Sequence, residues 1–284
     1  MFRAVSRHGF GMGWRPDGPW SHNVHHLMFS DVALRRAAAT TSLDLERTAF
    51  SPPVYDQGRI GSCQSNAGEG LVQFVRRKLN LGPDWTGSRL MTYYLVRKRE
   101  GTIGSDSGGT MGGTMQTLIK FGSCPEADWP YDDTPADPST GLFPAGCRAV
   151  TQPSAQAYTA AKLHEVVQGA RVYQDVLHMK AALLVGFPFM FGFVVMNSFF
   201  DDAGNPLTDI PLPEPTDQED GGHAVCGWGF DDHRPMPGGL TGALKCRNSW
   251  SANVQEAGYF WLPYAFVGSR ELASDFWTVT RMSQ

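Results

Sequence analysis

The sequence lacks several features that would place it in a specialised class of protein. It has only 5 cysteines among 284 residues, and none of them forms a CxxC pair. Neither a disulfide-dense scaffold nor a structural zinc site is therefore predicted. The formal net charge is -4, so there is no global basic field of the kind that attracts nucleic acid or anionic lipid. We expect no nucleic-acid partner.

Long apolar segments are also missing. The longest apolar run, residues 181–196, contains two glycines and a proline. It is shorter than the roughly 20 residues that a membrane-spanning helix needs, so no membrane partner is expected. The amino end breaks after two or three apolar residues and has no signal-peptide pattern. We expect a cytoplasmic protein, or one delivered without a classical signal peptide.

The scattered cysteines and histidines predict neither a metal nor another cofactor. A reducing compartment is the default, although a single bridge between Cys124 and Cys147 stays open as an alternative. His22, His25 and His26 could hold a metal in principle. No acidic or thiol residue lies between or beside them, however, so they are interpreted as surface histidines.

The first half of the chain has helical patterns. Apolar residues recur at helical spacing from Cys63 to Leu79, where an Asn-Leu-Gly-Pro sequence ends the pattern. Further helices are expected over 88–100 and 110–121, the second stopped by Gly122. These segments predict a helical lobe over about residues 55–135.

The second half changes in character after a proline-rich stretch, residues 125–153. One helix is expected around 175–185. Short apolar and aromatic runs punctuated by glycine follow it, and these are typical of strands in one antiparallel sheet. The pattern predicts a β lobe over about 150–280. A helical lobe followed by a β lobe is an α+β arrangement, and the junction of the lobes is the natural place for a cleft.

The stretch DQGRIGSCQSN, residues 56–66, carries the first candidate for chemistry. Cys63 comes at a predicted helix start, where unpaired N–H groups supply partial positive charge that favours a thiolate. In acyl transfer the attacked carbonyl becomes an oxyanion, which the N–H of such a cysteine and a side-chain amide can stabilise. Gln57, six residues earlier, supplies such an amide. Taken alone, a cysteine is more often a small buried hydrophobe.

The second half of the chain supplies the remaining groups of an acyl-transfer site. GGHAVCGWGFDD places His223 at the head of an apolar run, and KCRNSW places Asn248 25 residues later. An imidazole beside a thiol acts as base and then as acid for the leaving amine, while an amide oxygen fixes its tautomer. Trp250, two residues on, can cover the bond between His223 and Asn248 and exclude water.

Taken together and in this order, the motifs resemble those of the papain-like (C1-type) cysteine peptidases. DQGRIGSCQSNA resembles the nucleophile motif, GGHAV the histidine motif and RNSW the asparagine motif. SLDL at 42–45 resembles the segment that opens the mature domain, and residues 106–133 resemble the loop, helix and Pro-Tyr turn beside the substrate groove. The likeness spans about residues 40–280 and is closest to bacterial or viral members that lack a long propeptide.

The resemblance implies a papain-like two-lobe fold, with a helical left lobe, a right lobe of antiparallel sheet or barrel, and the active site in the cleft between them. It implies that Cys63 is the nucleophile, His223 the general acid and base, and Asn248 the residue that orients His223. Gln57 would be the oxyanion donor and Trp250 the shield. No metal or cofactor is implied.

The same resemblance implies where a substrate binds. The backbone of Gly108 or Gly109 would pair with an extended peptide, a form of strand addition. Gly222, directly before His223, would line the same site. Two glycine pairs occur in SGGTMGG, so glycine there can equally serve a tight turn.

The expected function is a cysteine peptidase that hydrolyses peptide bonds through a thioester acyl-enzyme, with a peptide or protein as substrate. Two alternatives stay open. The same site could transfer the acyl group to an amine, as an acyl transferase or transpeptidase, or the fold could serve as a catalytically silent peptide-binding module. Nothing in the sequence favours the silent module, because no catalytic position is lost.

The expected domains are an N-terminal segment, residues 1–40, and a peptidase domain, residues 41–284. The segment is too short for the helical prodomain that the family usually carries. It is interpreted either as a permanent part packed on the body or as a short plug near the cleft. The first interpretation is favoured, because its aromatic residues can bury enough surface to stay ordered.

Overall fold

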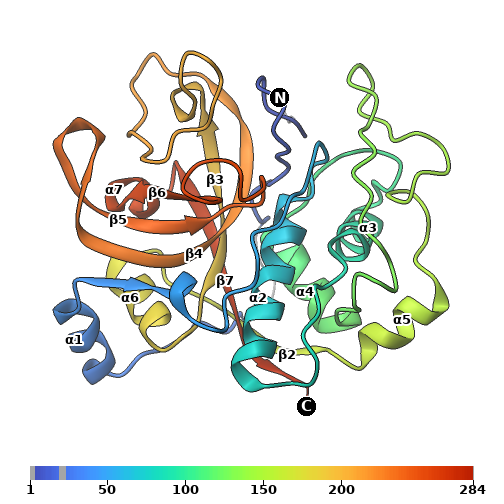
Figure 1. Cartoon of the computed structure of the whole chain (residues 1–284), viewed down its shortest axis with the longest axis horizontal. Coiled ribbons are helices and arrows are strands. Elements are labelled where there is room, and N and C mark those ends of the chain that lie inside the picture. Colours follow the sequence, from blue (N-terminus) through green and yellow to red (C-terminus); the bar gives the residue numbers. More distant parts are fainter. Residues whose placement is uncertain (1–3, 19–23, 284) are drawn as a thin grey trace.

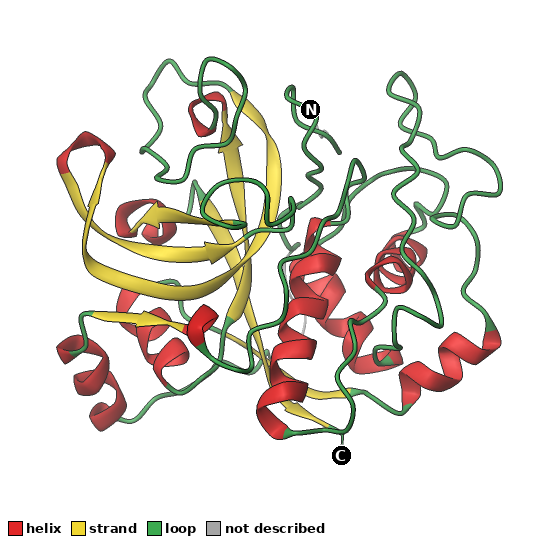
Figure 2. Ribbon diagram, viewed as in Figure 1, coloured by secondary structure: helices red, strands yellow, loops and turns green. Residues whose placement is uncertain are grey.

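Helix α2 (Cys63–Leu79) stands at the junction of two lobes (Figures 1 and 2). The helices within residues 89–162 lie on one side of it, and most of the sheet lies on the other side together with the remaining helices. The computed structural model describes residues 4–18 and 24–283. Both lobes and the α+β class agree with the sequence-based expectation. Among the described helices, none has the length and hydropathy required to cross a bilayer.

Two of the predicted helices begin at the residues that capping signals indicate. Ser88 accepts a hydrogen bond from Met91 N at the start of α3 (Arg89–Glu100), and Thr110 accepts one from Gly113 N at the start of α4 (Met111–Phe121). Helix α2 ends at Asn80, which adopts a left-handed φ of 52°. The other helices are α1 (Asp31–Ala39), α5 (Ala155–Lys162), α6 (Val176–Leu184) and α7 (Tyr264–Gly268).

Helix α5 was not predicted from the sequence, since it follows directly on the proline-rich stretch. Ser154 caps it by accepting a hydrogen bond from Ala157 N. Its buried residues Ala157 and Ala161 pack in one apolar cluster with Met91 and Leu95 of α3. This part of the chain therefore lies on the helical lobe.

The sheet is antiparallel throughout, in the order β2-β7-β3-β4-β5-β6, with β1 paired to β4. Its central strand pair, β3 and β4, places Phe193 opposite His223. The strands are β1 (Ser42–Asp44), β2 (Val166–Arg171), β3 (Phe189–Met196), β4 (Glu219–Met236), β5 (Leu240–Arg247), β6 (Tyr259–Pro263) and β7 (Ala273–Met282). Short 3₁₀ turns occur at Leu45–Arg47, Asn197–Phe199 and Pro237–Gly239.

Aromatic packing fixes α2 against the sheet. Phe74 of α2 meets Trp228 of β4 edge to face, with ring centroids 5.1 Å apart. Behind them, Phe191 of β3 stacks on Phe276 of β7 at 4.8 Å. Because the body of α2 is locked into this core, its first residue is held in a fixed position beside β4.

Candidate active site

Cys63 is the first residue of α2 and is fully buried. Its thiol lies 3.8 Å from Oε1 of Gln64, and backbone N–H groups of Gln64 and Ala224 lie close enough to lower its pKa. Ala224 directly follows His223 in β4, so the start of the helix meets the histidine strand at this point. The thiol at the start of α2 therefore lies beside the strand that carries His223.

His223 is fully buried, and its ring is held from two sides. Nε2 lies 2.8 Å from Oδ1 of Asn248, at the end of the neighbouring strand β5. The indole of Trp250 stacks on the imidazole, with ring centroids 4.4 Å apart and an interplanar angle of 24°. Nδ1 of His223 has no hydrogen-bond partner among the described residues.

A chain of amides sets the tautomer of His223, and sequence reasoning missed its outer member, Gln255. The carbonyl of Leu207 can only accept, so it takes a hydrogen bond from Nε2 of Gln255 at 2.8 Å. Oε1 of Gln255 then accepts from Nδ2 of Asn248, also at 2.8 Å. The remaining Oδ1 of Asn248 faces His223 as an acceptor, so the proton of the neutral imidazole lies on Nε2. Nδ1 keeps its lone pair.

Gln57 is fully buried in the turn before α2. Its Oε1 accepts a hydrogen bond from Oγ of Ser249 at 2.6 Å, and its Nε2 donates one to the carbonyl of Ile60 at 2.9 Å. An amide nitrogen carries two hydrogens, so this pattern leaves Nε2 with a second one. Ser249, which fixes the amide orientation, follows Asn248 directly and was not singled out from the sequence.

The N-terminal segment crosses the cleft and pairs with the glycines that were predicted to bind substrate. Gly109 donates to the carbonyl of Gly13 at 2.8 Å, and Arg15 N donates to the carbonyl of Gly109 at 3.1 Å. The carbonyl of Gly222 accepts from the N–H groups of Gly13 and Trp14 at 2.9 and 3.0 Å. The dark blue segment lies between the two lobes (Figure 1).

Gly108 does not take part in this pairing. Its N–H donates to the hydroxyl of Tyr93 at 3.1 Å, and its φ of 65° is a left-handed conformation that favours glycine. Gly108 therefore forms the turn that presents Gly109 to the cleft. Of the two glycines named from the sequence, Gly109 faces the extended segment.

The same segment continues past Trp250 on the other side of the thiol. The indole Nε1 of Trp250 donates to the carbonyl of Gly11 at 2.6 Å, and Phe10 packs on the Trp250 ring at 4.8 Å. Residues 10–15 therefore run over the histidine shield, past Cys63 and along Gly109.

Burial changes the titration of both central groups. It raises the pKa of the Cys63 thiol to about 12 from 9.0, although nearby backbone N–H groups lower it. It lowers the pKa of His223 to about 4 from 6.5, although the bond to Asn248 acts in the opposite direction. With the segment in place, thiol and imidazole are therefore both neutral near pH 7.

The other cysteines and histidines add no second site. All five cysteines lie in the described part of the chain and are free thiols, with Cys124 and Cys147 in different apolar clusters. His22 lies outside the described residues. Within residues 4–18 and 24–283, no three His, Cys, Asp or Glu side chains gather as a metal site.

Comparison with known proteins decides the family. No protein-family model matches the chain. It is 34% identical over 236 residues to an uncharacterized peptidase C1-like protein of Acanthamoeba polyphaga mimivirus, covering 80% of this chain and 70% of the viral protein. The crystal structure of xylellain, a cysteine protease from Xylella fastidiosa, superimposes with a TM-score of 0.87 at 40% identity, covering 98% of both chains.

The chain belongs to the C1 family of papain-like cysteine peptidases. It is thus a cysteine-type peptidase with the two-lobe papain-like fold. Procathepsin B from Trypanosoma congolense shares that fold, with a TM-score of 0.63 at 15% identity over 89% of this chain and 80% of the other. Membership of this peptidase family implies peptides or proteins as substrates.

Proposed function

We propose that this C1 peptidase hydrolyses peptide bonds through a thioester acyl-enzyme formed on Cys63. The sulfur attacks the substrate carbonyl carbon while the thiol proton passes to Nδ1 of His223. The C–N bond then breaks, and the same proton goes to the leaving amine. Water, deprotonated by His223, attacks the thioester and releases the acid and the free thiol.

The observation that carries this proposal is the state of His223. The amide chain through Asn248 leaves Nδ1 unprotonated, and among the described residues it has no hydrogen-bond partner; the next residue along the strand, Ala224, lies close enough to Cys63 to lower the pKa of the thiol. A general base needs such a lone pair within reach of the proton that it removes. In the proposed reaction, the second hydrogen of Gln57 Nε2 and the N–H of Cys63 stabilise the oxyanion.

We further propose that the N-terminal segment is a plug that must leave before substrate binds. Its N–H groups at Gly13 and Trp14 both donate to the carbonyl of Gly222. The carbonyl of Gly13 is engaged by Gly109 instead of pointing into the oxyanion site. The segment is therefore not positioned for attack. A substrate strand would take its place along Gly109 and Gly222.

The proposal is tested by covalent labelling and product analysis. Wild-type protein is incubated with an irreversible epoxide inhibitor of thiol proteases, alongside Cys63→Ala, and intact masses are measured. We expect one adduct on wild type and none on the variant, together with peptide hydrolysis that Cys63→Ala abolishes. No adduct and no hydrolysis, even after Trp14→Ala loosens the plug, would support a silent binding module. Conversion of an added amine into the main product would instead identify an acyl transferase.

A further inference from the structure

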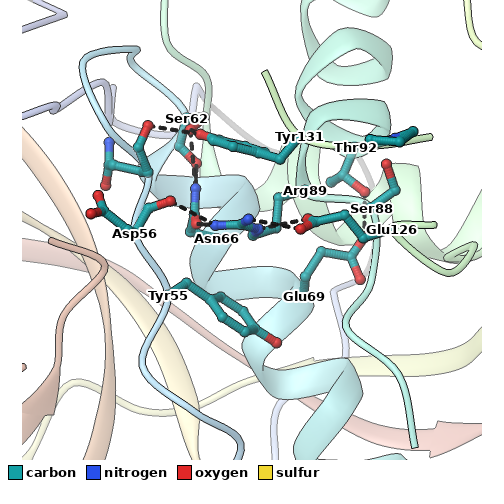
Figure 3. Close-up of polar contacts among 12 residues, drawn as sticks. Tyr55, Asp56, Ser62, Asn66, Glu69, Ser88, Arg89, Thr92, Glu126 and Tyr131 are labelled. Atoms are coloured by element: carbon teal, nitrogen blue, oxygen red, sulfur yellow. Dashed lines mark hydrogen bonds and ion pairs between the residues drawn. The ribbon is translucent and has the colours of Figure 1, made fainter. Parts of the chain in front are cut away.

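Arg89 is a buried cation in the helical lobe. Its guanidinium reaches toward the loop of residues 56–62, which leads into Cys63. Arg89 is the first residue of α3 and is only 8% exposed. Its Nε and one terminal nitrogen bind both oxygens of Glu126 at 2.8 and 2.9 Å. The other terminal nitrogen donates to the carbonyl of Asp56 at 2.8 Å and to Oδ1 of Asn66 at 3.0 Å. Figure 3 shows the guanidinium between Glu126 and Asn66.

A chain of hydrogen bonds, called the relay here, leads from Arg89 back to the loop of residues 56–62. Each donor and acceptor in it can be assigned. Asn66 accepts from Arg89 through Oδ1 and donates through Nδ2 to the carbonyl and the hydroxyl of Ser62, both at 3.0 Å. The Ser62 hydroxyl lies 2.6 Å from the hydroxyl of Tyr131, which in turn donates to the carbonyl of Gln57 at 2.9 Å. Because that carbonyl only accepts, the proton between the two hydroxyls comes from Ser62.

This network closes a ring around the two groups assigned to the oxyanion site. Arg89 holds the carbonyl of Asp56 directly, and the relay holds the carbonyl of Gln57 at its far end. Ser62, in the middle of the relay, directly precedes Cys63. The intervening residues 58–61 form no regular secondary structure. No helix or strand therefore sets the spacing between the Gln57 amide and the Cys63 N–H. This ring holds it, together with the carboxylate of Asp106, which accepts from Gly61 N at 2.9 and 3.0 Å.

The surroundings of residue 89 fit an arginine better than a lysine. The guanidinium lies 4.0 Å from the centroid of the Tyr131 ring and 5.0 Å from that of Tyr55. One edge of the planar guanidinium bonds Glu126, and the other edge bonds the loop. A lysine ammonium is a single point charge and cannot make both sets of hydrogen bonds in a fixed geometry. Glu126 balances the charge, so the cation costs less to bury than an unpaired one.

We propose that Arg89 is a positioning residue that fixes the two oxyanion donors, Gln57 and Cys63 N–H, in the geometry required by the transition state. The inference rests on the proposed function, because it assumes that these two groups stabilise an oxyanion. Arg89 itself bonds Glu126, Asp56 and Asn66 rather than the thiol or the imidazole. Its effect should therefore be confined to the step in which an oxyanion forms.

The test compares Arg89→Lys and Tyr131→Phe with wild type. Arg89→Lys keeps the positive charge but loses the planar set of donors. Tyr131→Phe removes only the hydroxyl that links Ser62 to Gln57. Arg76→Lys is the matched control, since Arg76 is a buried arginine stacked on Trp85 that bonds backbone carbonyls at the other end of α2. Each change is made in the full chain, alone and combined with Trp14→Ala so that the plug does not mask the site.

We expect kcat for a peptide substrate to fall about 10- to 100-fold in both test variants, less than the roughly 10²- to 10³-fold loss of a whole oxyanion donor. KM should stay within about twofold, because substrate pairing along Gly109 is unaffected. The rate at which iodoacetamide alkylates Cys63 should also stay within about twofold, since this displacement forms no oxyanion. Arg76→Lys should lower the melting temperature without this selective loss of kcat.

The outcomes separate this inference from the proposed function. If neither wild type nor Trp14→Ala hydrolyses the peptide or forms an epoxide adduct, the proposed function is contradicted. An active wild type with unchanged kcat in Arg89→Lys and Tyr131→Phe overturns the role of Arg89 alone. Equal losses of kcat and of alkylation rate would also overturn it, because they indicate general damage to the thiol site. If Arg89→Lys does not fold, Tyr131→Phe alone decides.

Discussion

The indole of Trp14 fills the space next to Gly192 so closely that a Cβ atom on Gly192 would lie 1.9 Å from Cε2 of Trp14. Gly222 borders the same ring, where a Cβ atom would lie 2.8 Å from Cε3. The lack of side chains at these two strand glycines thus leaves a pocket that accepts a large side chain. The indole of Trp14 occupies it. Trp14 is 5% exposed, so the indole is a main apolar anchor of the plug.

Trp14→Ala should therefore activate the full-length chain. Truncation of a buried tryptophan costs about 3–5 kcal/mol, and here that energy holds the segment in the cleft. We expect kcat/KM for a peptide substrate and the alkylation rate of Cys63 to rise at least about tenfold. Trp85→Ala is the control, since Trp85 packs under Arg76 and His164 outside the cleft. Equal rates in wild type and Trp14→Ala would show that the segment does not limit access.

The amide chain behind His223 predicts a graded series of losses. Asn248→Ala should lower kcat less than Cys63→Ala, because orientation of the base is only part of the about 10²- to 10⁴-fold that acid–base catalysis contributes. Gln255→Ala should lower it by less again, about three- to tenfold, because Asn248 keeps its bond to His223 but loses the partner that fixes its amide. Steady-state kinetics measure the series.

Asn253→Ala is the control for that series, because Asn253 is an exposed asparagine in the same loop as Gln255. It should retain wild-type kcat. A loss at Asn248→Ala as large as that at Cys63→Ala would mean that Asn248 does more than orient the imidazole. No loss at Gln255→Ala would mean that the amide orientation is fixed without it.

Glu69 gives a pH-dependent stability that can be measured without any substrate. Burial raises the pKa of this carboxyl to about 7 from 4.5, against hydrogen bonds from Ser123 and Thr92. A pKa raised by folding means that the folded state favours the protonated acid. Stability is therefore retained below pH 4.5 and lost as the pH rises to about 7. The step from 4.5 to about 7 corresponds to a free energy on the order of 3 kcal/mol.

Glu69→Gln should accordingly raise the free energy of unfolding at pH 8 and have little effect near pH 4.5. Urea unfolding at the two pH values measures the difference. Glu214→Gln, at an exposed glutamate, should show no such dependence. If Glu69→Gln destabilises the protein equally at both pH values, the carboxyl is not held protonated by its burial.

The order of the motifs was enough to predict the family, and local signals were enough for most helices. Ser88 and Thr110 cap α3 and α4 where the sequence indicates, because capping depends on residues three positions apart. Helix α5 was missed, since its short alanine-rich pattern follows prolines and is stabilised by packing on α3. The partners Ser249 and Gln255 were also missed, because nothing local marks a side chain that orients another.

By itself, the sequence determined which groups are available for chemistry: a thiol at a helix start, an imidazole at a strand head, and amides at the right places in the chain. Only the tertiary structure decided which of them meet, since strand pairing and the packing of α2 on the sheet join residues more than 150 positions apart. It also decided that residues 10–15 lie in the cleft, a placement that the sequence interpretation had not favoured. Hydrogen bonds from Gly109 and to Gly222 involve backbone atoms, and such contacts leave no pattern of side chains to read.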